Sequence, residues 1–149
     1  MYFDPRGLRF GATLTTVVLA IALITQSVWV IGFQTVVFAI GAIAGLKAAP
    51  YGVIFKSVIR PRLSAPADLE AEAPPRFAQA VGLIFALVAT IGFASGAAVI
   101  GVVATAIALA AAFLNAAFGF CLGCEVFLVI RRITGGSTER LVPVGSITN

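Results

Sequence analysis

The sequence predicts an all-α integral membrane protein with four transmembrane helices arranged as two hairpins. Hydrophobic residues make up 60% of the 149 residues and charged residues only 11%, whereas soluble domains contain about 45–50% and about 25%. The apolar segments have about the length of a bilayer crossing, which takes about 20 residues. A soluble globule is excluded because too few charges exist to cover its surface, and a disordered chain is excluded because the apolar content is too high.

The first hairpin is expected to begin close to the N-terminus. Its first span would run from about residue 10 to 31 and its second from about 35 to 49, joined by a turn at residues 32–34. Trp29 would anchor this turn at the interface, where tryptophan is enriched. Pro50 is expected to end or kink the second span, since proline removes a helical hydrogen bond. The first span should be retained, because no signal-peptide cleavage site follows it.

A cytoplasmic loop is expected at residues 50–76. Within it, the pattern of apolar and polar side chains over residues 51–60 favours a short amphipathic helix lying on the membrane surface. The alternative is that this stretch continues the second span beyond a proline kink. Residues 61–75 contain four prolines and few apolar side chains, which indicates a loop.

The second hairpin is expected to follow this loop. Its first span would cover residues 77–94, with a tight turn at residues 95–96. The next span covers residues 97–120 and stays apolar to about residue 130, which is too long for one upright crossing, so it either tilts strongly or breaks near Gly119. Residues 135–149 are expected to form a flexible polar tail.

The basic residues predict the orientation. Ten Lys and Arg against six Asp and Glu give a net charge of +4, and all ten precede the first span, separate the second from the third, or follow the fourth. Basic residues favour the cytoplasmic side, so both termini and the large loop are expected there, in the bacterial plasma (inner) membrane. The lipid bilayer is therefore an expected partner. Nucleic acid is not, because no basic cluster is interleaved with stacking aromatics.

The two halves of the chain show a weak internal repeat. Arg9-Phe10-Gly11-Ala12 opens the first hairpin and Arg76-Phe77-Ala78-Gln79 opens the second. Since both hairpins would start and end in the cytoplasm, this would be a parallel two-helix repeat with its axis along the membrane normal. The alternative is that every hairpin of this orientation has basic cytoplasmic ends.

The most informative motif is Cys121-Leu122-Gly123-Cys124, which contains both cysteines of the chain. A spacing of three places both sulfur atoms on one helix face and brings the Cα atoms near the distance that a disulfide tolerates. Its expected place is the cytoplasmic end of the fourth span. A structural disulfide is disfavoured in a reducing cytosol, so a dithiol that cycles is the sharper interpretation.

Neighbouring residues would make this dithiol reactive. A thiolate is stabilised by a helix N-terminus or a cation, and Gly119 and Gly123 would break the helix so that a new N-terminus begins at the motif. Glu125, one turn after Cys121, would accept or deliver a proton, or pair with an arginine. The arginines expected to tune the thiolate from the membrane interface are Arg9, Arg76 and Arg131.

Other interpretations of the cysteines stay open. Cysteine packs well between membrane helices. Glycines four residues apart allow close helix contact, and such pairs include Gly41 with Gly45, Gly92 with Gly96, and Gly119 with Gly123. Two thiolates in a chain without histidine cannot complete a tetrahedral zinc site, although a four-sulfur site across a dimer or two-coordinate copper(I) is formally possible. We assign no metal and no cofactor. The lack of histidine excludes Ser–His–Asp and Cys–His catalysis.

Two polar side chains are expected inside the spans. Gln79 and Asn115 each carry an amide that needs a partner in hydrocarbon, and a hydrogen bond across helices is the simplest expectation for Asn115. The alternative is that both line a substrate path.

Several strings are similar to those of a known family: Asp4-Pro5-Arg6, Pro50-Tyr51-Gly52, Pro74-Pro75-Arg76-Phe77-Ala78-Gln79 and Gly119-Phe120-Cys121-Leu122-Gly123-Cys124-Glu125. They resemble the bacterial membrane family catalogued as domain of unknown function 4395, over about residues 4–132. The resemblance implies a small integral membrane protein and favours sulfur chemistry, with a thioredoxin-like or sulfurtransferase protein as its partner.

Together these observations predict thiol–disulfide exchange or sulfane-sulfur handling. Cys121 would attack a disulfide or a sulfane-sulfur donor, and Cys124 would resolve the mixed disulfide. One alternative is a carrier or channel for a small sulfur-containing solute, which would need a homo-oligomer because four spans are few. Another is a structural or assembly subunit in which the cysteines only pack.

Overall fold

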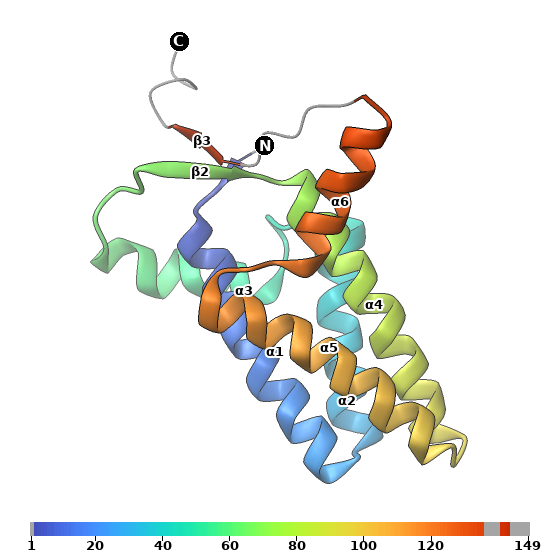
Figure 1. Cartoon of the computed structure of the whole chain (residues 1–149). Helices are drawn as coiled ribbons and strands as arrows, with labels where there is room; N and C mark the ends of the chain where they lie inside the picture. Colours follow the sequence, from blue (N-terminus) through green and yellow to red (C-terminus); the bar gives the residue numbers. More distant parts are fainter. Residues whose placement is uncertain (1, 136–140, 144–149) are drawn as a thin grey trace.

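The structure, a computed structural model, describes residues 2–135 and 141–143 and is mostly helical (Figure 1). The predicted all-α class is confirmed. The helices are α1 (Pro5–Thr25), α2 (Val28–Ala39) with the π-helix η1 (Ile40–Ala44), α3 (Pro50–Ile54) with the π-helix η2 (Phe55–Ile59) and the 3₁₀-helix η3 (Arg60–Arg62), α4 (Ala73–Ala94), α5 (Ala98–Phe118) and α6 (Leu122–Ile133). The strands are β1 (Tyr2–Phe3), β2 (Asp68–Ala71) and β3 (Leu141–Pro143).

Three helices, α1, α4 and α5, are long and apolar enough to cross a membrane. Only 22%, 17% and 22% of their most apolar windows are buried within the chain, so most of each apolar surface faces outward. In water such a surface would drive aggregation, whereas lipid tails cover it without penalty. The apolar helix Val28–Ala44, formed by α2 and η1, is shorter.

The turn of the first hairpin lies earlier than expected. The prediction at residues 32–34 is wrong, because α1 ends at Thr25 and the chain reverses at Gln26 and Ser27. Gln26 adopts a φ of 51°, and the Ser27 hydroxyl accepts a hydrogen bond from the backbone N–H of Val30 at 3.4 Å. Serine is a strong helix N-cap, so this local interaction sets the start of α2. Gly32, which was expected in the turn, lies inside the apolar helix α2.

The helices that correspond to the predicted spans also have bounds other than those expected. The first begins at Pro5, because the Asp4 side chain accepts from the backbone N–H of Arg6 at 2.9 Å and caps α1. The second ends at Ala44 rather than 49, where Gly45 takes a φ of 97°. Pro50 begins α3 instead of ending a span, in agreement with the preference of proline for the first helical position.

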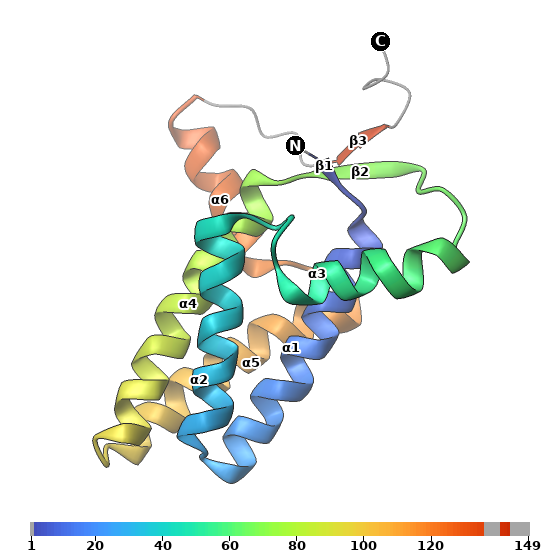
Figure 2. The ribbon, with the colours of Figure 1, turned by 180° about the vertical axis from the view of Figure 1, so that it is seen from behind.

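The predicted short helix after the second span is present as α3 with η2 and η3. Residues 45–49 are not helical, so the alternative of a span continued beyond a kink is wrong. Figure 2 shows that this helix runs across the bundle rather than along it. The third span begins at Ala73, four residues earlier than predicted, since Pro74 and Pro75 fit the first turn of α4.

The fourth apolar run breaks rather than tilting as one helix. Gly119 has a φ of 68° and ends α5, and α6 begins at Leu122 after Cys121 has capped it. The expected turn at residues 95–96 is confirmed, with Gly96 at a φ of 85°. The new helix N-terminus predicted at the cysteine motif is therefore present.

A small antiparallel sheet was not predicted. In the order β1-β2-β3, Phe3 pairs with Glu70 and Leu69 pairs with Val142. Residues 68–71, expected within a loop, thus form the central strand. The flexible tail expected at 135–149 contains strand β3, so that prediction is wrong for 141–143. Residues 136–140 and 144–149 lie outside the described part of the chain.

The two halves have the same element order of strand, long helix, returning helix and short crossing helix. Across the halves, α1 packs against α5 and α4 packs against α2, so the first helix of each half contacts the second helix of the other. The shared core contains small and branched side chains from all four helices: Leu19, Ala22, Ile31, Phe38, Ala86, Ala89, Ala104 and Ala108. We call the end of the bundle where α1 and α4 begin the charged end.

Each of the three glycine pairs allows a close helix approach, as predicted, but through one of its two glycines. In each pair one glycine permits a close approach, and the other has a positive φ at the end of its helix. Gly41, Gly92 and Gly123 make the close approaches, to Gln79, to the Gly101 backbone and to Ala78, respectively. Gly45, Gly96 and Gly119 are the residues with positive φ. The spacing therefore marks the places where helices both touch and stop.

Gly92→Ala tests this packing. A Cβ at Gly92 would lie 2.8 Å from the backbone nitrogen of Gly101, so we expect a loss of about 1–3 kcal/mol in unfolding free energy. Gly32→Ala is the matched control, because nothing lies within 4 Å of its Cβ position and alanine favours a helix. Thermal unfolding of the purified protein in detergent measures both. Equal melting temperatures for the two variants would contradict the close contact.

Candidate functional site

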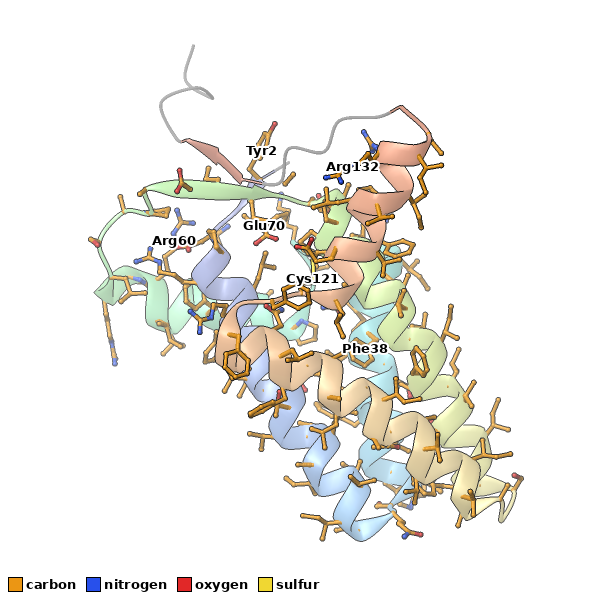
Figure 3. All side chains as sticks on the ribbon, viewed as in Figure 1. Tyr2, Phe38, Arg60, Glu70, Cys121 and Arg132 are labelled. Carbon is orange, nitrogen blue, oxygen red and sulfur yellow. A yellow bond between two sulfur atoms is a disulfide. The ribbon has the colours of Figure 1, made fainter. Side chains whose placement is uncertain are left out.

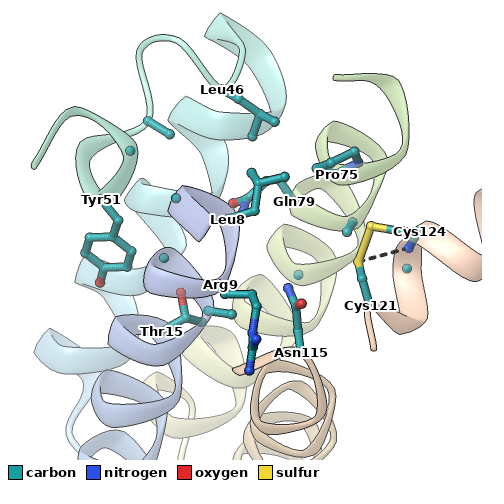
Figure 4. A pocket seen from close by; sticks show the side chains of 18 of the residues that line it. Leu8, Arg9, Thr15, Leu46, Tyr51, Pro75, Gln79, Asn115, Cys121 and Cys124 are labelled. Carbon is teal, nitrogen blue, oxygen red and sulfur yellow. Dashed lines mark hydrogen bonds between the residues drawn. A yellow bond between two sulfur atoms is a disulfide. The ribbon is translucent and has the colours of Figure 1, made fainter. Parts of the chain in front are cut away.

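A cavity of about 1130 Å³ lies at the charged end of the bundle. Its walls come from α1, α4 and α5, from α3 and η2, from strand β2, and from the chain around the cysteine motif. Figure 4 shows Gln79, Asn115, Arg9 and the two cysteines around this space. The structure thus brings together five of the residues that the sequence singled out.

The cysteines form one wall of the cavity. Cys121 and Cys124 are joined by a disulfide, with their Cα atoms 5.2 Å apart. Cys121 is the N-cap of α6, and its sulfur accepts a hydrogen bond from the backbone N–H of Cys124 at 3.2 Å. Cys121 is 7% exposed and Cys124 is 1% exposed. The described form is the oxidised one, in which Cys121 occupies the position that stabilises a thiolate on reduction.

Close packing against α4 holds the motif in place. A Cβ on Gly123 would lie 2.6 Å from the Cβ of Ala78, the residue next to Gln79. Only glycine allows the first turn of α6 to approach α4 this closely. The two cysteines are thereby fixed against α4 at the cavity wall.

Arg9 and Arg76 cap helix ends in corresponding ways. The Arg9 guanidinium donates from Nη2 to the carbonyl oxygens of Ala116 and Ala117 near the end of α5, at 3.1 and 3.4 Å. Arg76 donates to the carbonyl oxygens of Ala42 and Ile43 near the end of η1, both at 2.8 Å. A cation at a helix C-terminus satisfies free carbonyls and opposes the helix dipole.

The other charged candidates lie outside the cavity wall. Arg76 is committed to η1 and to Glu72, 3.8 Å away, and Arg131 lies over the Phe127 ring at 5.5 Å. Glu125 is in the first turn of α6, where its backbone N–H donates to the Cys121 carbonyl at 3.0 Å. Of the three predicted arginines, therefore, only Arg9 lines the cavity with the cysteines.

Gln79 and Asn115 both line the cavity, from α4 and α5. Within residues 2–135 and 141–143, neither side-chain amide has a hydrogen-bond partner, so the cross-helix bond expected for Asn115 is wrong for the described chain. Gln79 lies against η1, where a Cβ on Gly41 would be 3.0 Å from its Oε1. The two amides are therefore available to pair with a molecule in the cavity.

Sequence reasoning missed a buried polar pair next to the cavity. The Tyr51 hydroxyl donates to Oε1 of Gln34 at 2.7 Å, and Gln34 is fully buried. Burial raises the pKa of Tyr51 to about 12, so it stays a neutral donor. Gln34 was assigned to the mistaken turn, and its place in the middle of a long apolar stretch was the signal that could have identified it.

Charged side chains surround the upper part of the cavity. The cations are Arg9, Lys47, Lys56 and Arg60, and the acids are Asp4 and Glu70. Burial alone raises the pKa of Asp4, but hydrogen bonds from the Arg6 side chain and backbone, with the charges of Arg6 and Arg60, hold it below its usual value. Figure 3 shows Arg60, Glu70 and Cys121 at the charged end, with Phe38 farther into the bundle.

The family model described as Domain of unknown function (DUF4395) matches residues 3–132. The chain belongs to this family. The match covers every helix but the last residue of α6, and it includes the cavity and the cysteine motif. No curated protein and no solved structure matches the chain. The DUF4395 family membership that the sequence strings indicated is thus confirmed.

Tyr51→Phe tests the buried pair. Removing the hydroxyl leaves a fully buried Gln34 oxygen without its donor, so we expect the unfolding free energy to fall by about 1–3 kcal/mol. Tyr2→Phe is the control, since Tyr2 is 44% exposed. Adding Gln34→Leu to Tyr51→Phe should recover part of the loss, because neither polar group is then left buried. Chemical unfolding in detergent measures all three. A Tyr51→Phe protein as stable as the Tyr2→Phe control would contradict the pairing.

Proposed function

We propose that this chain is a four-span membrane protein in which Cys121 and Cys124 carry out thiol–disulfide exchange or sulfane-sulfur transfer at the cytoplasmic face of the bacterial inner membrane. The observation that carries the proposal is the position of Cys121. Its sulfur caps the N-terminus of α6 and accepts a backbone N–H, while the residue lines a cavity large enough for a small substrate. Both features lower the barrier to thiolate attack.

The exchange would proceed in two balanced steps. With the pair reduced, the Cys121 thiolate attacks one sulfur of a substrate disulfide, forms a mixed disulfide and releases the other half as a thiolate. Cys124, having lost its proton, attacks Sγ of Cys121, forms the intramolecular disulfide and releases the remaining thiolate. The substrate gains the two electrons that the pair loses. With a sulfane-sulfur donor, the intermediate is a persulfide on Cys121 and the second leaving group is hydrosulfide.

The four-span arrangement is supported by the distribution of charge. In the described part of the chain, the basic residues lie at or beyond the charged end, and the turns at 26–27 and 95–97 carry no charge. Besides the three long helices, the remaining span would be formed by α2 with η1, the second in chain order. Its 12 and five residues give about 25 Å of helix. That is a little shorter than a typical hydrocarbon core of about 30 Å, a mismatch that local thinning accommodates. Both termini would then be cytoplasmic.

Duplication of one unit is supported by reciprocal packing. The arginine at the start of each long helix caps the returning helix of the other half, Arg9 on α5 and Arg76 on η1. Each half also has its short helix next to its own long helix, α3 beside α1 and α6 beside α4. Basic hairpin ends alone would not require this exchange of partners. A parallel repeat with its axis along the membrane normal accounts for it.

The burial of the cysteines bears on the partner. A thioredoxin-like or sulfurtransferase protein would have to reach Cys121, the more exposed of the two, or hand over its sulfur through a small molecule. Carriage of a small sulfur-containing solute by an oligomer is the second candidate, favoured by the two amides without partners in the cavity. Solute uptake into vesicles by a Cys121→Ser protein would identify transport, because exchange chemistry needs that sulfur.

Single cysteine variants test which sulfur reacts. After reduction, Cys124→Ser in membranes should react with 5,5′-dithiobis(2-nitrobenzoate) roughly ten or more times faster at pH 7 than Cys121→Ser, because Cys121 caps a helix and Cys124 is more buried. The mixed disulfide should persist in Cys124→Ser, which lacks the resolving thiol. The double serine variant gives the background. If both single variants react equally slowly with the reagent and become reactive only on denaturation, the cysteines serve packing alone.

A further inference from the structure

The cavity continues from the charged end into the apolar part of the bundle. Gly119 and Cys121 line it at the level of the motif, and Ile107 and Ala108 line it at its deep end. Residues 108–119 belong to the helix α5 except for its cap, Gly119, so the cavity extends about 16 Å along the helix axis. A fully polar ligand would gain nothing by entering the apolar deep end, whereas a molecule with a polar head and an apolar tail would bury its tail there.

The deep walls are shaped for such a tail. Phe38 and Phe85 line the cavity on one side, and small side chains of α5 line it on the other, among them Ala108, Ala111 and Ala112. Alanines along one helix face leave a slot that larger residues would fill. The charged residue Arg60 lies at the opposite, outer end (Figure 3).

The head of the ligand would meet two amides and the disulfide. Gln79 and Asn115 face the cavity without hydrogen-bond partners in the described chain, and each amide can donate to a carbonyl oxygen. Both side chains are only partly buried, and two amides without partners at one cavity fit a ligand with two acceptors, or ordered water. Cys121 and Cys124 line the same cavity (Figure 4), so a head group bound at the amides would share this space with the disulfide.

We infer that the cavity binds a membrane quinone and that this quinone is the two-electron acceptor for the Cys121–Cys124 pair. A quinone has two ring carbonyls for the two amides and an apolar tail for the slot. This inference rests on the proposed thiol chemistry and supplies the oxidant that returns the pair to its disulfide form. A phospholipid shares the polar head and the apolar tail, but it cannot accept electrons, so the disulfide in the wall favours the quinone.

The electron transfer balances without another reactant. The Cys121 thiolate adds to a ring carbon, the electron pair moves to the carbonyl oxygen, and this oxygen takes one proton. The Cys124 sulfur, on losing its proton, attacks Sγ of Cys121, so that the S–S bond forms and the S–C bond breaks. The ring leaves as the hydroquinone with the second proton. The two thiols lose two electrons and two protons in total, and the quinone gains them.

The test uses the full-length protein, reduced and freed of reductant, in lipid nanodiscs. Decylubiquinone is added, its reduction is followed by absorbance, and the thiols are counted by the gel shift with a bulky maleimide. We expect about one quinol per chain together with the loss of both thiols. Ala111→Phe and Asn115→Leu should raise the quinone concentration needed for half-maximal rate about tenfold or more. Val103→Phe is the matched control, because Val103 faces outward from α5 and is 52% exposed.

The possible failures are distinguishable. Wild-type thiols that react with 5,5′-dithiobis(2-nitrobenzoate) but not with decylubiquinone would overturn the quinone inference and leave the proposed exchange standing. If decylubiquinone does not react, and a phospholipid copurifies with the wild-type protein but not with Ala111→Phe, the occupant of the cavity is a lipid. Thiols that react with neither reagent would overturn both proposals. Equal quinone dependence of Ala111→Phe and Val103→Phe would show that reduction occurs outside the cavity.

Discussion

The contact of Arg9 with the end of α5 is the interaction on which the site depends. A helix that ends close to hydrocarbon leaves carbonyl groups that no water can reach, and such groups cost several kcal/mol each. The guanidinium satisfies those of Ala116 and Ala117, so α5 can end at Gly119 without continuing toward the surface. The next helix, α6, then begins at Leu122, with Cys121 as its N-cap. An arginine on one half of the chain thus places the cysteines of the other.

The same arrangement explains why a cavity exists at all. Both returning helices stop early, α5 against Arg9 and η1 against Arg76, while α1 and α4 reach the charged end. Segments of α3, η2 and β2 line the cavity beside these helix ends, and Figure 2 shows α3 running across the bundle. Polar side chains of α1 and α4 that would be buried between longer helices face this space instead. A cavity that ends in the bundle core is therefore a consequence of helix length, not of a missing side chain.

Composition and segment length were enough to predict the helical class, and specific residue strings indicated the family. The break near Gly119 was one of two alternatives that the length of the fourth apolar run left open. The turn at Gln26 was missed because hydropathy is uniform across it and only the capping of Ser27 marks it. The sheet was missed because the pairing of Phe3 with Glu70 joins residues far apart in the chain, and such pairing leaves no local pattern. The cysteine motif was found from spacing alone. The residues around the motif were predicted less well. Of the three arginines proposed, Arg9 faces the cavity and Arg76 and Arg131 do not, a difference that depends on the fold and leaves no mark in the sequence.

The two halves use one architecture for different purposes. Where α6 begins at the Cys121–Cys124 disulfide on the cavity wall, α3 begins at Pro50 and places Tyr51 in a buried hydrogen bond with Gln34. That bond secures the short helix of the first half through a side chain deep in α2, whereas the short helix of the second half is held by the tight contact of Gly123 with Ala78. The hydrogen bond between Tyr51 and Gln34 holds the helix in place but offers no reactive group at neutral pH, because the tyrosine hydroxyl stays protonated. A glycine contact leaves the neighbouring side chains free for chemistry. The two halves thus share the arginines that cap their returning helices, and they differ at the short helices, where the second half carries the cysteine pair.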